Sequence, residues 1–196
     1  MSDDGSDVPS LKLILVGTSG VGKTSLVSAY FDQQFEKQTL PTVAPAFCSA
    51  FVTLLDGRKV ELRMWDTAGQ EQYQAVSQMF YRDAQVCFVC YDSESQDTIS
   101  TWVDAVKAQV PDCILILVLT KSDLLNDDQL SDARSKGIEL THTYKMNSHY
   151  ITSSYSGFGV KEVFQAAAAC VDITYSHKDP VINTLDGDTQ PHEGCC

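Results

Sequence analysis

The chain has 196 residues, of which 43% are hydrophobic, and its formal net charge is −12. This length favours one domain with one substantial core. Lys and Arg total only 14 and do not cluster, which argues against a nucleic-acid surface. A helix that spans a bilayer needs about 18 consecutive apolar residues, and every apolar run in this sequence is much shorter. The first ten residues are acidic where a secretory signal is basic and then apolar, so we expect a protein made and folded in the cytosol.

Three short runs are apolar at nearly every position, as strands in the middle of a helix-covered parallel sheet are. They cover residues 11–16, 86–91 and 113–119. Apolar residues recur with helical spacing from Ile99 to Val106 and predict a helix that ends before Pro111. The same spacing from Val160 to Val171 predicts a closing helix.

A hairpin completes the predicted sheet. Asp56-Gly57 is a strong signal for a two-residue turn between strands at 47–55 and 58–65, and residues 149–153 are expected to form a sixth strand. The sequence therefore predicts an α/β fold in three layers, with a six-stranded, mainly parallel sheet, one antiparallel edge strand and helices on both faces.

Three segments are expected along the chain. Residues 1–10 are predicted to be a flexible acidic N-terminus, 11–175 the folded domain, and 176–196 a flexible tail, because the composition there is polar without periodicity.

The cysteines and histidines do not suggest a disulfide framework or a metal site. Cys87 and Cys90 match C-x-x-C, but positions i and i+3 of a strand point to opposite faces, so core packing is the favoured interpretation. The four histidines lack metal-ligand spacing, and we expect no chemistry of them.

Residues 17–24, GTSGVGKT, fit the phosphate-loop pattern G-x-x-x-x-G-K-[ST] between a predicted strand and a predicted helix. Backbone N–H groups and the positive helix end would wrap a polyphosphate there. Lys23 would reach the β- and γ-phosphates, and the Thr24 hydroxyl would bind Mg²⁺. The alternative is a glycine-rich connection with an incidental Lys-Thr. The expected phosphate-binding residues are Ser19, Gly20, Val21, Gly22, Lys23, Thr24 and Ser25.

Three further stretches follow predicted strands: WDTAGQE at 65–71, TKSD at 120–123 and TSSYSG at 152–157. Together with the phosphate loop, these stretches resemble the Ras superfamily of small GTPases over about residues 11–175. This resemblance implies the P-loop NTPase fold, with the nucleotide bound along the carboxyl ends of the strands. Residues 46–92 look most like Rab proteins, with a leaning toward those of early endosomes. The aromatic residues found where Rabs carry switch-region aromatics are Phe47, Trp65 and either Phe80 or Tyr81; ordinary core packing is the alternative.

The resemblance implies how guanine would be bound. Asp123 would accept from the N1 and N2 donors of the base, which adenine does not present, so GTP is preferred to ATP. Lys121 and Phe35 would lie against the two faces of the base, although core packing is an alternative for Phe35. Ser153 and Ser154 would present backbone groups to the guanine O6, and the base-binding loops also contain Thr120 and Tyr155.

The same resemblance implies a hydrolytic switch. Thr42 would hold Mg²⁺ with Thr24, and Asp66 would hold it through water. Gly69 would contact the γ-phosphate, and Gln70 would orient the attacking water. Lys23 and Gln70 are thus the expected catalytic residues. Loss of the γ-phosphate would release loops at about 36–47 and 67–80. No arginine is an obvious candidate to assist in cis, so hydrolysis should be slow without an activating protein.

Several positions depart from the Rab pattern. Thr120 stands where Rabs usually have Asn, although the Rho branch uses Thr, and we expect base binding to survive. Ser154 and Tyr155 replace Ala and Lys, which should weaken the guanine contacts modestly. Ala44 precedes Pro45 and is pushed toward extended geometry. Ser19 would alter intrinsic hydrolysis in either direction.

The chain ends in Cys195-Cys196, which in Rabs is a site of double geranylgeranylation. The resemblance therefore implies a monomeric switch in vesicular trafficking that cycles between the cytosol and the cytoplasmic face of endomembranes, with a leaning toward endosomes. Its expected partners are effectors, an exchange factor, a GTPase-activating protein and a GDI-type prenyl-binding chaperone. Two alternatives are a P-loop ATPase or kinase, and a pseudo-GTPase scaffold; retention of Lys23, Thr42 and Gln70 argues against the second.

Overall fold

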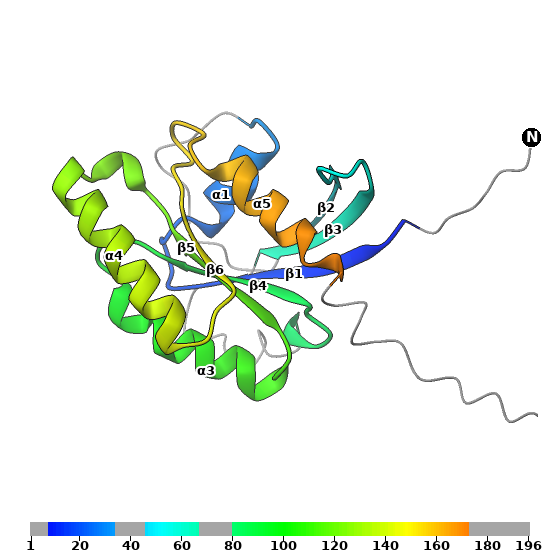
Figure 1. Cartoon of the computed structure of the whole chain (residues 1–196), viewed down its shortest axis with the longest axis horizontal. Coiled ribbons are helices and arrows are strands. Elements are labelled where there is room, and N and C mark those ends of the chain that lie inside the picture. The colour runs from blue at the N-terminus through cyan, green and yellow to red at the C-terminus, as the bar shows by residue number, and fades with distance from the viewer. Residues whose placement is uncertain (1–7, 34–45, 67–79, 173–196) are drawn as a thin grey trace, which may run out of the picture.

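The structure, a computed structural model, describes residues 8–33, 46–66 and 80–172. Its centre is a six-stranded sheet in the order β2-β3-β1-β4-β5-β6 (Figure 1). β2 is antiparallel to β3, and the other neighbouring pairs are parallel, which confirms the predicted topology. The strands are β1 (Ser10–Val16), β2 (Ala46–Thr53), β3 (Lys59–Asp66), β4 (Val86–Tyr91), β5 (Ile114–Leu119) and β6 (Ser148–Ile151).

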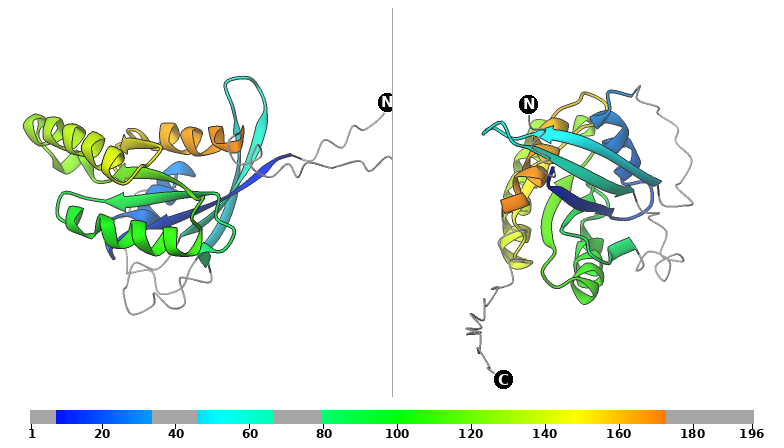
Figure 2. Two further views of the ribbon diagram at one scale, coloured as in Figure 1. Left: turned by 60° about the horizontal axis from the view of Figure 1, so that its bottom comes forward. Right: turned by 90° about the vertical axis from the view of Figure 1, so that its right-hand side faces the viewer.

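Helices cover both faces of the sheet (Figures 1 and 2). α1 and α5 pack on one face and α3 and α4 on the other, and each pair shares a separate hydrophobic core with the strands. None of the described helices combines the length and the apolar character that crossing a bilayer requires. The described helices are α1 (Lys23–Tyr30), α3 (Ile99–Gln109), α4 (Asp127–Thr143) and α5 (Val160–Ala169), with 3₁₀ turns η2 (Gln96–Thr98) and η3 (Ser122–Leu124).

Strand β4 shows why the central runs are apolar throughout. All six of its residues are buried, because each face of the strand meets a helical layer. Cys87 packs in the α3/α4 core and Cys90 in the α1/α5 core, both as free thiols. The prediction that these two cysteines face opposite sides and pack in the core is confirmed.

The β2–β3 turn differs from the predicted two-residue turn. Leu54 N donates to Arg58 O at 2.8 Å and Gly57 N to Leu54 O at 3.0 Å, so three residues form the loop. Gly57 has φ 88°, whereas Asp56 is not left-handed. A two-residue type I′ turn needs positive φ at both central residues, and a type I turn followed by a left-handed glycine needs it only at the glycine. The strands consequently end at Thr53 and begin at Lys59.

Helix α4 was not predicted by apolar periodicity. Only Ala133 and Gly137 are buried on it, so its apolar stripe is too thin to detect. The sequence feature that marks this helix is a capping box at its start. The Asn126 side chain accepts from the Gln129 backbone N–H, and the Gln129 side chain accepts from the Asn126 backbone N–H.

Gly137 allows α4 to pack against β6. A Cβ at this position would lie 2.1 Å from the ring of His149, whose Nε2 is 3.0 Å from the Tyr91 hydroxyl. Burial lowers the pKa of His149 to about 4, so the ring is neutral at pH 7. A side chain at position 137 would therefore displace a ring that is packed and hydrogen-bonded.

We predict that Gly137→Ala destabilises the protein, although alanine alone favours a helix over glycine by about 1 kcal/mol. Overpacking against His149 should cost about 1–3 kcal/mol and outweigh that gain. Urea denaturation measures the difference. In a His149→Ala background, which removes the ring, the same change should become stabilising. A stabilising effect in both backgrounds would contradict the packing argument.

Candidate nucleotide-binding site

The site lies where the parallel strands end. β1, β3, β4, β5 and β6 run in the same direction, so their carboxyl ends meet at one edge of the sheet. The phosphate loop follows β1, Asp66 ends β3, and the TKSD and TSSYSG stretches follow β5 and β6. This is the edge at which open α/β sheets bind ligands.

The phosphate loop, residues 17–22, contains three glycines, and all of them have positive φ. Gly17 has φ 143°, and a Cβ there would lie 2.3 Å from the Cys90 carbonyl oxygen of neighbouring β4. Gly22 has φ 103° and precedes α1 without a side chain that caps the helix. The positive end of α1 is therefore a place that suits an anionic ligand.

Lys23 is fixed inside this loop. Its side chain is buried, and Nζ donates to Gly17 O at 2.7 Å and to Thr18 O at 3.1 Å. Burial lowers the pKa of Lys23 because the charged form loses solvation. A buried ammonium is stabilised by a nearby anion, which fits a phosphate at this point.

Thr24 and Asp66 form the adjacent polar pair. Thr24 Oγ1 donates to Asp66 Oδ2 at 2.5 Å, while Asp66 Oδ1 is buried and has no hydrogen-bond partner among the described residues. Burial raises the pKa of Asp66, an effect that the Thr24 hydrogen bond and the Lys23 charge oppose. A hydroxyl beside an unsatisfied carboxylate oxygen is a donor set that suits Mg²⁺, which prefers oxygen ligands.

Thr120 follows β5, is predicted to lie near the base, and is hydrogen-bonded to the phosphate loop. It is buried, and its hydroxyl donates to Val21 O at 2.6 Å and lies 3.1 Å from Tyr91 O. The threonine that replaces the usual asparagine thus retains a side-chain donor that holds the loop.

The TKSD and TSSYSG loops are bonded directly to each other. Ser153 Oγ donates to Asp123 Oδ1 at 2.6 Å and accepts from Ser156 N at 3.1 Å. Ser122 N donates to Thr152 O at 3.1 Å. The sequence predicted only a backbone role for Ser153; its hydroxyl also orients the Asp123 carboxylate, and such a contact between two loops has no local sequence signal.

Lys121 forms an ion pair that the sequence did not predict. Its Nζ lies 2.7 Å from Asp92 Oδ2, and its backbone is left-handed with φ 55°. Burial would raise the pKa of Asp92, but the hydrogen bonds from Lys121 and Ser95 hold it below its usual value. Asp92 directly follows β4 and so lies at the edge where the carboxyl ends of the parallel strands meet. This position in the sequence could have identified Asp92 as a residue of the site.

The remaining predicted residues are distributed around this centre. Ser19 and Gly20 are exposed on the loop, Val21 is buried beneath it, and Ser25 is half-buried on α1. After β6, Ser154 is half-buried and Tyr155 is 61% exposed. Other predicted site residues lie outside the described ranges: Phe35, Thr42, Gly69, Gln70, Cys195 and Cys196.

An aromatic row flanks the site on the β2–β3 side. The ring centroids of Phe47 and Trp65 are 5.0 Å apart, and those of Trp65 and Phe80 are 5.4 Å apart. Phe47 is 54% exposed, whereas Tyr81 is buried in the α3/α4 core. Of the two candidates for the third aromatic, Phe80 joins the row and Tyr81 does not.

The fold and this edge define a P-loop nucleotide-binding protein. A sequence model of the Ras family matches residues 12–172. GTP-binding protein ypt4 of Schizosaccharomyces pombe is 32% identical over 168 residues, 82% of this chain and 71% of that protein. Human Ras-related protein Rab-15 is 35% identical over 157 residues, 78% of this chain and 72% of that protein.

A third relative, Ypt/Rab-type GTPase ypt7 of Schizosaccharomyces pombe, is 30% identical over 200 residues, 95% of this chain and 96% of that protein. The chain belongs to the Ras family of small GTPases and, within it, to the Rab/Ypt group. It binds GTP and GDP, hydrolyses GTP and acts in membrane trafficking.

We predict that Thr120→Val weakens the binding of GDP and GTP about tenfold, because the lost hydroxyl leaves Val21 O without its donor, a cost of about 1–2 kcal/mol. Release of a fluorescent GDP analogue measures the effect. Thr120→Ser keeps the hydroxyl and should release the analogue at nearly the wild-type rate. Equal release from wild type and Thr120→Val would show that the hydroxyl does not support the loop.

Proposed function

We propose that this Rab-like GTPase is a Mg²⁺-dependent membrane switch whose nucleotide is held by the residues of the strand-end edge. The observation that carries the proposal is the arrangement of Lys23, Thr24 and Asp66. The Lys23 ammonium is tied to the phosphate loop, and a threonine hydroxyl and a buried carboxylate lie beside it. Such a cluster matches a polyphosphate with its metal ion.

The phosphates would be bound mainly by backbone groups. The N-terminus of α1 and the loop 17–22 would supply N–H donors, and Lys23 adds a fixed positive charge. Thr24, Asp66 and Thr42 would hold Mg²⁺, which neutralises phosphate charge when bound. Asp66 Oδ1, which has no hydrogen-bond partner among the described residues, is the atom that supports this assignment.

The base would be read by Asp123. Its carboxylate accepts from Ser153 Oγ through Oδ1, which orients the group toward donors on guanine N1 and N2. Lys121 and Phe35 would cover the faces of the base, and Ser154 and Tyr155 would complete the loop. This arrangement gives preference for GTP over ATP.

Hydrolysis would use Gln70 to orient water, while Thr42 and Gly69 would sense the γ-phosphate and change the surface that effectors bind. All four arginines lie in described residues, and none of them hydrogen-bonds to the phosphate loop there. Two are paired elsewhere, Arg58 with Asp172 and Arg63 with Glu61. Slow turnover without an activating protein is therefore expected.

Membrane attachment would come from geranylgeranyl groups on Cys195 and Cys196. The segment 176–196 contains one lysine and four acids, so it offers no electrostatic attraction to an anionic leaflet. We propose a monomer on the cytoplasmic face of endomembranes, of endosomal type, served by an exchange factor, a GTPase-activating protein and a GDI-type chaperone.

We predict that Lys23→Ala abolishes tight nucleotide binding and leaves the secondary structure intact, because the phosphates lose their cation while alanine remains compatible with α1. The nucleotide content of the purified protein and far-UV circular dichroism provide the two readouts. Lys136→Ala removes the same charge from an exposed pair on α4 and serves as the control. Wild-type GTP affinity in Lys23→Ala would refute the phosphate-loop assignment.

Gln70→Leu should bind GTP normally and hydrolyse it more slowly, both alone and with an activating protein, because leucine cannot orient water. Single-turnover hydrolysis measures this. Gln109→Leu, at the exposed end of α3, is the matched control and should behave as wild type. If Gln70→Leu hydrolysed GTP at the wild-type rate, another residue would have to orient the attacking water.

Cys195→Ser and Cys196→Ser should each shift the protein largely to the cytosol, because one lipid gives only marginal binding and the tail repels an anionic membrane. Membrane fractionation measures the distribution. Asp186→Lys with Asp188→Lys should restore part of the binding of a single variant by adding cations. If each single variant stayed as membrane-bound as wild type, a protein contact would be the anchor instead.

A further inference from the structure

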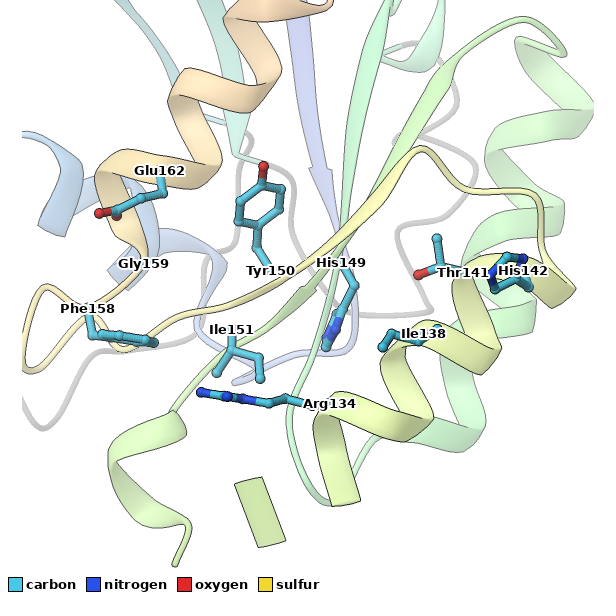
Figure 3. A pocket seen from close by; sticks show the side chains of 10 residues that line it. All are labelled: Arg134, Ile138, Thr141, His142, His149, Tyr150, Ile151, Phe158, Gly159 and Glu162. Carbon is cyan, nitrogen blue, oxygen red and sulfur yellow. The ribbon is translucent and has the colours of Figure 1, made fainter. Parts of the chain in front are cut away.

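A groove of about 550 Å³ lies away from the nucleotide site, along β6 and between α4 and α5 (Figure 3). β6 is the last strand of the sheet, so its outer edge has no neighbouring strand in the described fold. Ile138 on α4 and Phe158 before α5 line the groove and are 59% and 57% exposed. The volume is that of a ligand pocket, and these two side chains present an apolar surface without a cover in the described residues.

We propose that the tail of this same chain covers the groove, with residues 181–185, VINTL, as the docked segment. Val181, Ile182 and Leu185 are the only branched aliphatic residues after position 176. They match the apolar walls formed by Ile138 and Phe158.

The tail is long enough to reach. The first turn of α5 borders the groove through Glu162, and the ten residues of the helix place its far end about 15 Å away. Residues 173–180, which follow the described chain, can extend up to about 26–29 Å. Val181 can therefore enter the groove from the α5 side.

Charges at the two sides of the groove complement those of the segment. Arg134 extends from α4 beneath Ile151 (Figure 3), and no ion pair is formed by it within the described residues. Asp186 and Asp188 follow the apolar segment and would reach Arg134, while Lys178 precedes it on the side of Glu162. A chain that enters beside α5 and leaves past the Arg134 guanidinium brings its two acidic residues to that cation.

The local sequence also favours an extended approach. Pro180 biases Asp179 toward extended geometry, and an extended segment beside a free strand edge is a recurrent mode of peptide recognition. The groove and the segment include neither the nucleotide nor the lipids. If Cys195 and Cys196 carry the lipids proposed above, only residues 186–196 would connect the docked segment to the membrane. The distance between the folded domain and the membrane would then be limited to about 36–40 Å.

Hydrogen exchange on the full-length GDP-loaded protein tests the proposal. Amide exchange over residues 134–151 should be at least threefold faster in Ile182→Asp/Leu185→Asp than in wild type, and exchange in α3 should be unchanged. The groove variant Ile138→Asp should give the same acceleration, and combining it with the tail change should add nothing. Thr189→Asp/Gln190→Asp adds the same two charges beyond the segment and should behave as wild type.

Charge reversal provides a second readout. Arg134→Glu should accelerate exchange along the groove, and Asp186→Lys/Asp188→Lys in the same chain should reverse that acceleration. Equal exchange in wild type and the Ile182→Asp/Leu185→Asp variant would overturn the proposal. Protection that rises with protein concentration and persists in that tail variant would also overturn it, since the groove would then hold a second copy.

Discussion

The parallel alignment of five strands is the constraint on which the rest of this molecule depends. Because their carboxyl ends meet at one edge, four loops that are distant in sequence can reach a single ligand. The alignment is tight enough that Gly17 approaches the Cys90 carbonyl closely, and a Cβ would lie 2.3 Å from that oxygen. β4, which carries Cys90, is buried on both faces at the centre of this arrangement.

Hydrogen bonds across that edge convert proximity into a defined geometry. The Thr120 hydroxyl holds the phosphate loop through Val21 O, and the Ser153 hydroxyl holds the Asp123 carboxylate. The two sides of this edge are thus connected through hydrogen bonds within the protein itself. Lys23 is part of the same arrangement, since its buried ammonium donates to loop carbonyls.

The free side of β6 has a different character from the nucleotide edge. There the described chain leaves an apolar groove with one cation, Arg134, between α4 and α5. The nucleotide edge is polar and tied together by side-chain hydrogen bonds, whereas this groove is bordered by exposed Ile138 and Phe158. A single sheet therefore separates a site for a charged ligand from a surface suited to an apolar segment.

Local patterns in the sequence predicted the sheet strands and the phosphate loop, because strand periodicity and the G-x-x-x-x-G-K-T spacing act over a few residues. The roles expected of the TKSD and TSSYSG stretches came from the family resemblance instead. Only the tertiary structure decided that Phe80 rather than Tyr81 joins the aromatic row, and that Asp92 pairs with Lys121. It also decided the role of Thr120, whose partner Val21 is 99 residues away. Such contacts depend on strand order and packing across the sheet, which short stretches of sequence do not encode.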